Sequence, residues 1–221
     1  MNPDTDFSIR SFLGGYDNNF TYLITCSRTG AQVIVDAAIE LKKISKFIQD
    51  SPLAILITHG HNDHIMYLEE YANAYPNMTV LVHNKSEIIT KKYRIQSLAD
   101  KQTFQIGELQ FIPFYTPGHY YDSISYQLKP VLFTGDTMFV GRTGRVISKR
   151  SNINDLYDSI YNIILKMPDN IRIYPGHDYG VEPCISIRDN IKISPLLNAK
   201  NLEDFKKRMI NYEKNRKTDS Y

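Results

Sequence analysis

The chain has 221 residues, a formal net charge of +2 and two cysteines, which suits a globular protein of one large or two small domains. The small net charge gives no reason to expect nucleic-acid binding, and two cysteines do not make a disulfide framework, which favours a reducing compartment. No run of about 18 apolar residues and no N-terminal segment of signal type is present. We therefore expect a cytoplasmic protein that binds neither nucleic acid nor a membrane, and the oligomeric state stays open.

The first part of the chain predicts strands followed by a helix. Three strand candidates bounded by turn residues cover residues 7–13, 19–26 and 31–35. Asp36 ends the third candidate, where it would either orient a ligand histidine or cap a turn, and the sequence leaves both roles open. Apolar residues recur with helical spacing over residues 39–49, and the apolar run 53–57 is typical of a buried strand.

The stretch that follows this strand concentrates residues capable of metal chemistry. Three histidines and one aspartate fall within six positions, at His59, His61, Asp63 and His64. Imidazole nitrogens and carboxylate oxygens are ligands for zinc, iron or manganese. His59 and His61 lie two residues apart, so an extended chain directs both side chains to the same side. We predict a metal-binding loop over residues 58–64.

Strands and helices alternate through the rest of the chain. The predicted helices cover residues 65–75, 85–92, 153–167 and 202–215. The predicted strands cover residues 79–82, 109–115, 123–128, 131–134 and 171–173, with a hairpin turn at 105–108. We expect a loop over residues 141–152 and irregular structure over residues 181–199. This pattern predicts a layered α/β protein, a single domain over residues 1–221 with a short C-terminal helical tail from about residue 181.

Three further residues of ligand type each follow a short strand and stand beside a glycine, a pattern that does not by itself make them ligands. They are His119, Asp136 and His177. Glycine allows the backbone to turn tightly at the end of a strand, which suits a side chain that must reach into a common site. The remaining histidine, His83, ends another strand candidate, and we interpret it as structural or supporting.

The spacing His-x-His-x-Asp-His, followed downstream by His, Asp and His, resembles the signature of the metallo-β-lactamase superfamily. The resemblance implies an αββα sandwich that holds two divalent metal ions, zinc first, with iron or manganese as alternatives. It implies that one metal binds His59, His61 and His119, that the other binds Asp63, His64 and His177, and that Asp136 bridges them. It also implies that Asp63 orients or accepts a proton, so Asp63 and Asp136 are the candidate catalytic residues. The absence of a signal-type segment argues against a secreted antibiotic-degrading lactamase.

Within the superfamily, residues 133–137 and 174–179 resemble glyoxalase II-like thioesterases and persulfide dioxygenases. In both groups the positions of Arg145 and Tyr179 help to hold glutathione, which makes these two the candidate substrate-binding residues and a glutathione conjugate a candidate small-molecule substrate. The planar fork of arginine suits a carboxylate. The chain departs from the relatives after Arg145, where an aromatic residue is missing. Its C-terminal segment is also shorter than the helical domain that completes the glutathione site of full-length glyoxalase II, so recognition of glutathione stays open.

The resemblance leaves two reactions open. The first is a binuclear-metal hydrolase, in which a metal-bridging hydroxide cleaves a thioester such as a hydroxyacylglutathione. The alternative is a mononuclear non-haem iron persulfide dioxygenase that acts on glutathione persulfide, with iron held by His59, His119 and Asp136. A non-enzymatic binding module would predict a broken ligand set, and none of the seven candidates is missing. We predict the hydrolase, a glyoxalase II-like thioesterase.

Overall fold

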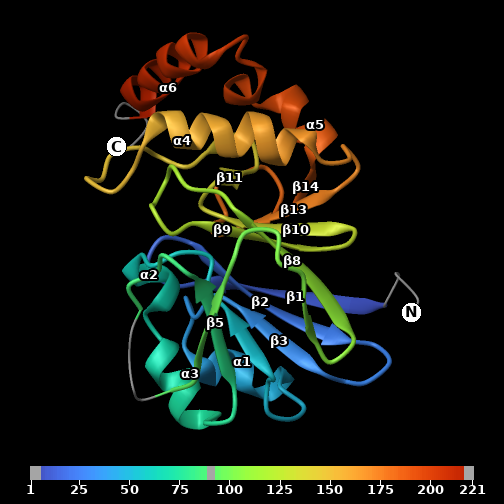
Figure 1. Cartoon of the computed structure of the whole chain (residues 1–221). Coiled ribbons are helices and arrows are strands. Elements are labelled where there is room, and N and C mark those ends of the chain that lie inside the picture. The colour runs from blue at the N-terminus through green and yellow to red at the C-terminus, as the bar shows by residue number, and fades with distance from the viewer. Residues whose placement is uncertain (1–5, 89–92, 217–221) are drawn as a thin grey trace.

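The computed structural model describes residues 6–88 and 93–216, and two six-stranded sheets lie face to face at its centre (Figure 1). The first sheet follows chain order, with antiparallel pairing up to its third strand and parallel pairing from there on. Its strands are β1 (Phe7–Gly14), β2 (Asn19–Cys26), β3 (Gln32–Val35), β4 (Ala54–Leu56), β5 (Thr79–His83) and β6 (Ile95–Leu98). The predicted strands of this half are confirmed.

The second sheet has the order β14-β13-β10-β9-β8-β7, with β10 and β13 parallel and the other pairs antiparallel. Its strands are β7 (Phe104–Ile106), β8 (Leu109–Tyr115), β9 (Ile124–Leu128), β10 (Val131–Gly135), β13 (Arg172–Pro175) and β14 (Ile185–Ser186). A separate small hairpin consists of β11 (Met138–Phe139) and β12 (Arg142–Thr143), so the expectation that residues 141–152 form only a loop is wrong at its start.

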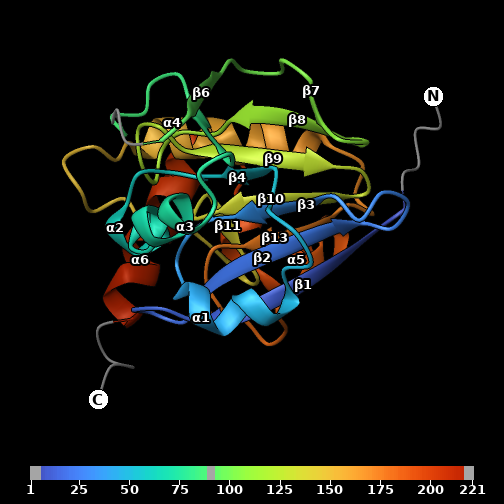
Figure 2. The ribbon, with the colours of Figure 1, turned by 90° about the horizontal axis from the view of Figure 1, so that it is seen from below.

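Helices cover the outer face of each sheet. Below the first sheet lie α1 (Leu41–Ile44), η1 (Ser45–Phe47) and α3 (Leu68–Ala74), while α2 (Asn62–Ile65) lies at the sheet edge (Figure 2). Above the second sheet lie α4 (Ile153–Asp158), η2 (Ser159–Ile163), η3 (Ile164–Lys166), α5 (Ile187–Ile193), η4 (Pro195–Asn198) and α6 (Leu202–Arg216) (Figure 1). The order helix, sheet, sheet, helix confirms the predicted αββα sandwich.

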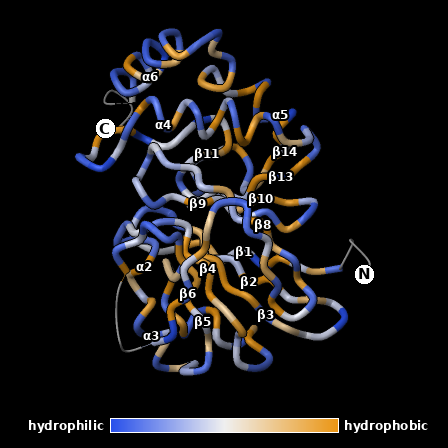
Figure 3. Tube along the Cα trace, viewed as in Figure 1, coloured by the Kyte–Doolittle hydropathy of each residue, from blue (hydrophilic) through white to orange (hydrophobic). Residues whose placement is uncertain are grey.

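Alternating side chains connect the four layers, because successive residues of a strand point to opposite faces. In β10, Val131 and Phe133 pack between the sheets, whereas Leu132 packs against the outer helices. In β4, Leu56 faces the other sheet and Ile55 faces the helices below. Strands buried on both faces need apolar residues throughout, which explains the hydrophobic runs within both sheets (Figure 3).

Two predicted helices differ from the structure, and one helix forms where none was predicted. The helix expected over residues 39–49 is confirmed only between Leu41 and Phe47, and residues 84–88 form a turn and irregular chain where a helix over 85–92 was expected. Residues 89–92 of that helix lie outside the described part of the chain. The expectation of irregular structure over residues 181–199 is wrong for α5. Its first turn is capped by Ser186, whose hydroxyl oxygen accepts the Asp189 N–H.

Among the described residues, no helix is both long enough and apolar enough to cross a membrane.

Candidate metal centre

The loop after β4 carries four of the predicted ligands to one edge of the sandwich. His59 is buried, and α2 begins directly after His61. Asp63 and His64 therefore lie on the single turn of α2, with His64 fully buried beneath it. The loop and α2 directly follow β4, one of the parallel strands of the first sheet (Figure 1).

Asp36 holds this loop in place from the end of β3. Its Oδ1 accepts the Thr58 N–H at 2.8 Å, and its Oδ2 accepts the Thr58 hydroxyl at 2.8 Å. His64 Nδ1 lies 2.8 Å from the same Oδ2. Asp36 is buried and adopts a φ of 58°, so the backbone bends at the strand end and directs the carboxylate at the loop. Of the two roles that the sequence left open, the structure shows the one that orients a histidine.

The three distant candidates arrive from the second sheet. His119 follows β8, Asp136 follows β10, and His177 follows β13. Gly176 precedes His177 at a place where a Cβ would lie 2.3 Å from Asp136 Oδ1 and 2.6 Å from His64 Cε1. Only glycine allows the backbone to approach the centre this closely. Gly176 therefore leaves room for the side chains of Asp136 and His64.

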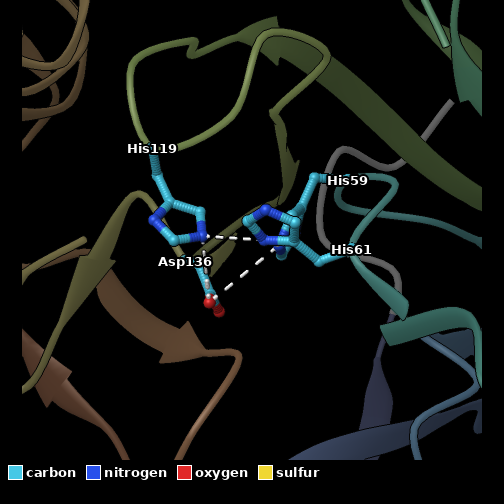
Figure 4. A group of neighbouring side chains, drawn as sticks. All are labelled: His59, His61, His119 and Asp136. Atoms are coloured by element: carbon cyan, nitrogen blue, oxygen red, sulfur yellow. Dashed lines mark hydrogen bonds and ion pairs between the residues drawn. The ribbon is translucent and has the colours of Figure 1, made fainter. Parts of the chain in front are cut away.

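One group of side chains joins His59, His61, His119 and Asp136, as Figure 4 shows. His61 Nδ1 lies 2.9 Å from His59 Nε2 and 3.0 Å from His119 Nε2. Asp136 Oδ2 lies 3.4 Å from His119 Nε2 and 4.0 Å from His59 Nε2. One ligand atom from each of these four residues lies within 4.8 Å of the others, which would allow all four to contact one ion.

A second group joins Asp63, His64 and His177 on the other side of Asp136. His177 Nε2 lies 3.2 Å from His64 Nε2 and 3.3 Å from Asp63 Oδ2. Asp136 reaches this group too, with Oδ1 3.2 Å from His64 Nε2 and Oδ2 3.2 Å from His177 Nε2. All seven predicted ligands therefore converge, and Asp136 stands between the two groups.

Hydrogen bonds outside the centre determine how four of the histidines present their rings. The Nδ1 partners are Thr58 Oγ1 for His59 (3.2 Å), Asp36 Oδ2 for His64 (2.8 Å), the Arg145 carbonyl for His119 (2.9 Å) and the Asp17 carbonyl for His177 (2.7 Å). Each partner accepts a hydrogen bond from Nδ1–H: the carboxylate and the two carbonyls can only accept, and the Thr58 hydroxyl already donates its own hydrogen to Asp36. A neutral imidazole that donates through Nδ1 has a lone pair on Nε2. All four Nε2 atoms of these rings point into the centre.

Burial and nearby charges shift the pKa values of the histidines differently in the two groups. Burial lowers the pKa of His59 and of His119, and it lowers the pKa of His61 to about 4, so these three rings are neutral at pH 7. Burial also acts to lower the pKa of His177, but the carboxylates of Asp136 and Asp63 outweigh it and raise that pKa to about 10. Burial acts to raise the pKa of Asp136, yet the neighbouring histidines hold it well below its usual range.

The chemistry of the converging donor atoms suits a bound metal ion. Inward lone pairs and carboxylates repel one another unless positive charge lies among them, whether as protons or as cations. Asp136 Oδ1 is buried and makes no hydrogen bond within the described residues, although His64 Nε2 lies 3.2 Å away. Imidazole held by an outer acceptor is the usual arrangement of a metal-ligating histidine.

Asp17 of the β1–β2 turn and Asn19, the first residue of β2, belong to the centre and were not found from the sequence. Asn19 is fully buried, and its Nδ2 donates to Asp63 Oδ2 at 2.9 Å. The Asp17 carbonyl accepts from His177, and the Phe20 N–H donates to the Gly176 carbonyl at 2.8 Å. No spacing in the sequence signals these contacts, because they join the turn and the start of β2 to loops that are distant along the chain.

A cavity of about 400 Å³ opens over the centre. Besides candidate ligands, it is lined by Tyr16, Met66, Phe139, Arg145 and Tyr179. Both predicted substrate-binding residues thus lie beside the candidate ligands, and their contact with a substrate stays a prediction. Arg145 is paired with Glu213, and the Tyr179 hydroxyl donates to Asp17. The Tyr179 ring also stacks on His177 at a centroid distance of 4.8 Å.

Comparison with known families agrees with this geometry. Residues 14–177 match the family described as the metallo-beta-lactamase superfamily. The chain belongs to this superfamily. The match confirms the resemblance noted in the sequence, and it spans every one of the seven candidate ligands. The family match and the names of its relatives support a metal-dependent hydrolase.

Relatives of this superfamily member have hydrolase names. It is 31% identical over 172 residues to "Probable polyketide biosynthesis zinc-dependent hydrolase BaeB" of Bacillus velezensis, covering 75% of this chain and 76% of the relative. It is 32% identical over 175 residues to a hydroxyacylglutathione hydrolase of Francisella tularensis subsp. novicida, covering 77% and 67%. Among solved structures, ETHE1 from Myxococcus xanthus superimposes with a TM-score of 0.80 at 28% identity, covering 93% of this chain and 91% of that one.

Proposed function

We propose that this protein is a binuclear metal-dependent hydrolase that cleaves a thioester, with a hydroxyacylglutathione as the first candidate substrate. The observation that carries the proposal is the position of Asp136, which lies within 3.4 Å of histidines from both groups. A single carboxylate between two sets of nitrogen and oxygen donors suits two neighbouring ions. The hydroxyacylglutathione comes from the name of the Francisella relative, which covers 77% of this chain.

The chain would hold its two metals with the seven converging residues. His59, His61 and His119 would hold one ion, Asp63, His64 and His177 the other, and Asp136 would contact both. Divalent ions bound here would polarise the substrate carbonyl and lower the pKa of a bound water. Zinc is the first candidate because the Bacillus relative is named a zinc-dependent hydrolase, and iron or manganese would also accept these donors.

Asp63 would orient the attacking water. Its contacts with Asn19, His64 and His177 all involve Oδ2, which leaves Oδ1 to accept a hydrogen bond from water. The side chain is about a quarter exposed, at 26%, and lines the cavity, so water and substrate reach it. Burial acts to raise its pKa, but His177, His64 and the Asn19 amide lower it, which keeps the carboxylate ionised. An ionised carboxylate at this position accepts a proton from water.

Arg145 and Tyr179 would hold the thiol arm of the substrate. Both line the same cavity as Asp63 and Asp136, so a thioester carbonyl over the centre leaves its arm within reach of them. Arg145 offers a planar cation and Tyr179 an aromatic face beside Phe139, at a ring distance of 5.1 Å. No serine or cysteine nucleophile is required.

A second candidate is the mononuclear iron dioxygenase acting on glutathione persulfide. His59, His119 and Asp136 supply two imidazoles and one carboxylate that converge, with both histidine Nε2 atoms within 4.0 Å of Asp136 Oδ2. Such a set suits a single iron with open positions. Under this candidate, His61, Asp63, His64 and His177 would support the three ligands.

Metal content per chain tests the two candidates. Protein purified without a chelator or an affinity tag is measured by elemental analysis, and then assayed for hydrolysis of lactoylglutathione. Close to two ions of zinc, manganese or mixed metals with thioester hydrolysis supports the hydrolase. Close to one iron with oxygen uptake on glutathione persulfide supports the dioxygenase instead. The Asp136→Ala variant should lose metal and activity together, and full activity in that variant would overturn the site.

A further inference from the structure

The guanidinium of Arg145 already binds a carboxylate of the chain itself. Its Nε lies 3.1 Å from both Glu213 carboxylate oxygens, and its Nη2 lies 2.7 Å from Oε2. Glu213 lies near the C-terminal end of α6, 68 positions along the chain from Arg145. This two-point pair uses the donors with which arginine would bind a substrate carboxylate.

Two neighbouring residues of the chain line two different cavities. Arg145 lines the cavity over the metal centre, and the next residue, Val146, lines a second cavity of about 410 Å³. The second cavity is otherwise walled by Ile153, Met209 and Ile210, with Glu213 and Lys214 also lining it. The Arg145 carbonyl accepts a hydrogen bond from His119, so the segment at residues 145 and 146 is attached to the metal centre. A ligand over the centre is thus one residue away from an apolar space.

Ile210 is placed for contact with a ligand in this second cavity. It lies on α6, one turn before Glu213, and 55% of it is exposed, whereas its neighbour Met209 is 5% exposed and packs into the core. The cavity therefore offers apolar surface that the fold leaves uncovered. Binding pockets are mostly apolar with a few charged groups that fix orientation, and Glu213 and Lys214 are the charged residues that line this one.

We propose that Glu213 competes with a substrate carboxylate for Arg145, and that the second cavity takes an apolar arm of the substrate instead. The inference rests on the proposed thioesterase function and revises its first candidate substrate, hydroxyacylglutathione: thioesters whose thiol arm is uncharged and apolar are preferred over thioesters whose arm carries a carboxylate, as the glutathione arm does. A glutathione carboxylate must displace Glu213 to bind Arg145 through Nε and Nη2, and the displaced Glu213 carboxylate then stays close to the negative charge of the substrate. An alkyl arm meets no such competitor and is removed from water against Val146 and Ile210.

The test compares lactoyl thioesters of glutathione and of hexanethiol in the metal-loaded protein. The variant Glu213→Gln keeps the size of the side chain but removes its charge. Its ratio of kcat/KM for the glutathione thioester over the hexanethiol thioester should rise about fivefold, the effect expected of one partly exposed ion pair. Glu203→Gln is the matched control, because Glu203 lies on the same helix and pairs with Lys206 at the surface. That control should leave the ratio unchanged.

A binding measurement separates this inference from the proposed reaction. By calorimetry, Glu213→Gln should bind S-methylglutathione about fivefold more tightly than the unaltered protein does. Ile210→Asn, at an exposed position, should lower kcat/KM for the hexanethiol thioester about threefold or more. An unchanged or weaker affinity for S-methylglutathione in Glu213→Gln would overturn the inference. Tighter binding together with no hydrolysis of any thioester would uphold the role of Glu213 and overturn the thioesterase function.

Discussion

The side-chain amide of Asn19 donates a 2.9 Å hydrogen bond to Asp63, across 44 positions of the chain. This bond connects the start of β2 in the first sheet to the carboxylate that would orient water. Asn19 is fully buried, and its amide lies only 3.4 Å from His177 Nε2, so it touches candidates from both sheets. The first hairpin of the fold thereby helps to define the position of Asp63.

Replacing Asn19 should impair catalysis more than stability of the sheets. In Asn19→Ala, Asp63 loses its neutral donor and rotates more freely, so kcat should fall about tenfold while KM changes little. The measurement is steady-state hydrolysis of lactoylglutathione by metal-loaded protein. Asn73→Ala, at an exposed position of α3, is the control and should keep full activity. An Asn19→Ala protein with unaltered kcat would show that Asp63 needs no support from Asn19.

Gly176 should be irreplaceable because its backbone passes so close to two candidate ligands. A Cβ at this position would lie 2.3 Å from Asp136 Oδ1 and 2.6 Å from His64 Cε1, which no real contact tolerates. We expect Gly176→Ala to bind less than one metal ion per chain and to unfold with about 1–3 kcal/mol less stability. Elemental analysis and thermal unfolding measure the two effects.

Gly14→Ala is the matched control for that substitution. A Cβ at Gly14 would lie 3.6 Å from the nearest atom of Ile39, an ordinary contact distance. Metal content should therefore be unchanged in Gly14→Ala. If Gly176→Ala also kept its full metal content, Asp136 and His64 would have to move without loss of binding, and the site geometry described above would be wrong.

Local pattern explains what the sequence could predict. His59, His61, Asp63 and His64 are close along the chain, so local order is enough to make them candidate ligands, whereas His119, Asp136 and His177 become candidates only through the family resemblance, which calls for a His, an Asp and a His after later strands. The αββα architecture required the family resemblance, since hydrophobic alternation alone does not determine which sheet faces which.

Contacts between distant segments explain what the sequence could not predict. The hydrogen bond from Asn19 to Asp63 and the ion pair from Arg145 to Glu213 join elements 44 and 68 positions apart, and neither has a sequence spacing that signals it. Helix α5, which was not predicted, does have a local signal. Ser186 and Asp189 have the Ser-x-x-Asp spacing of a helix N-cap, and their side chains form that contact in the structure.

Asp36 should matter for both metal binding and stability. It is buried, it accepts from the Thr58 N–H and hydroxyl, and it holds His64 Nδ1 at 2.8 Å. In Asp36→Asn, at least one of these donors would face the new NH2 group, which leaves buried polar groups unpaired at a cost of about 2 kcal/mol or more. We expect a lower free energy of unfolding and close to one metal ion per chain in place of two, because His64 belongs to the second group. Denaturant unfolding and elemental analysis of one preparation check this. An unaltered free energy of unfolding together with an unaltered metal content would show that Asp36 does not support the metal centre.

His83 should make stability depend on pH away from the metal centre. Its ring is buried and stacks on Tyr115 at 4.1 Å, and its Nδ1 faces the Lys85 N–H at 3.4 Å. Burial and the nearby Lys85 charge lower the pKa of His83 to about 4, with Asp100 acting weakly in the opposite direction. The folded state therefore favours the neutral ring.

The sign of the effect follows from that lowered pKa. The stabilisation is complete above the unfolded-state pKa of about 6.5 and is lost as the pH falls toward 4. His83→Phe keeps the stacking on Tyr115 but cannot take up a proton. The unfolding free energy of the unaltered protein, minus that of His83→Phe, should fall by about 1–2 kcal/mol between pH 7 and pH 5. Denaturant unfolding of both proteins at several pH values measures it, and taking the difference cancels the metal-site histidines, which are common to both. Parallel pH profiles would mean that the His83 ring is protonated as readily in the folded chain as in the unfolded one.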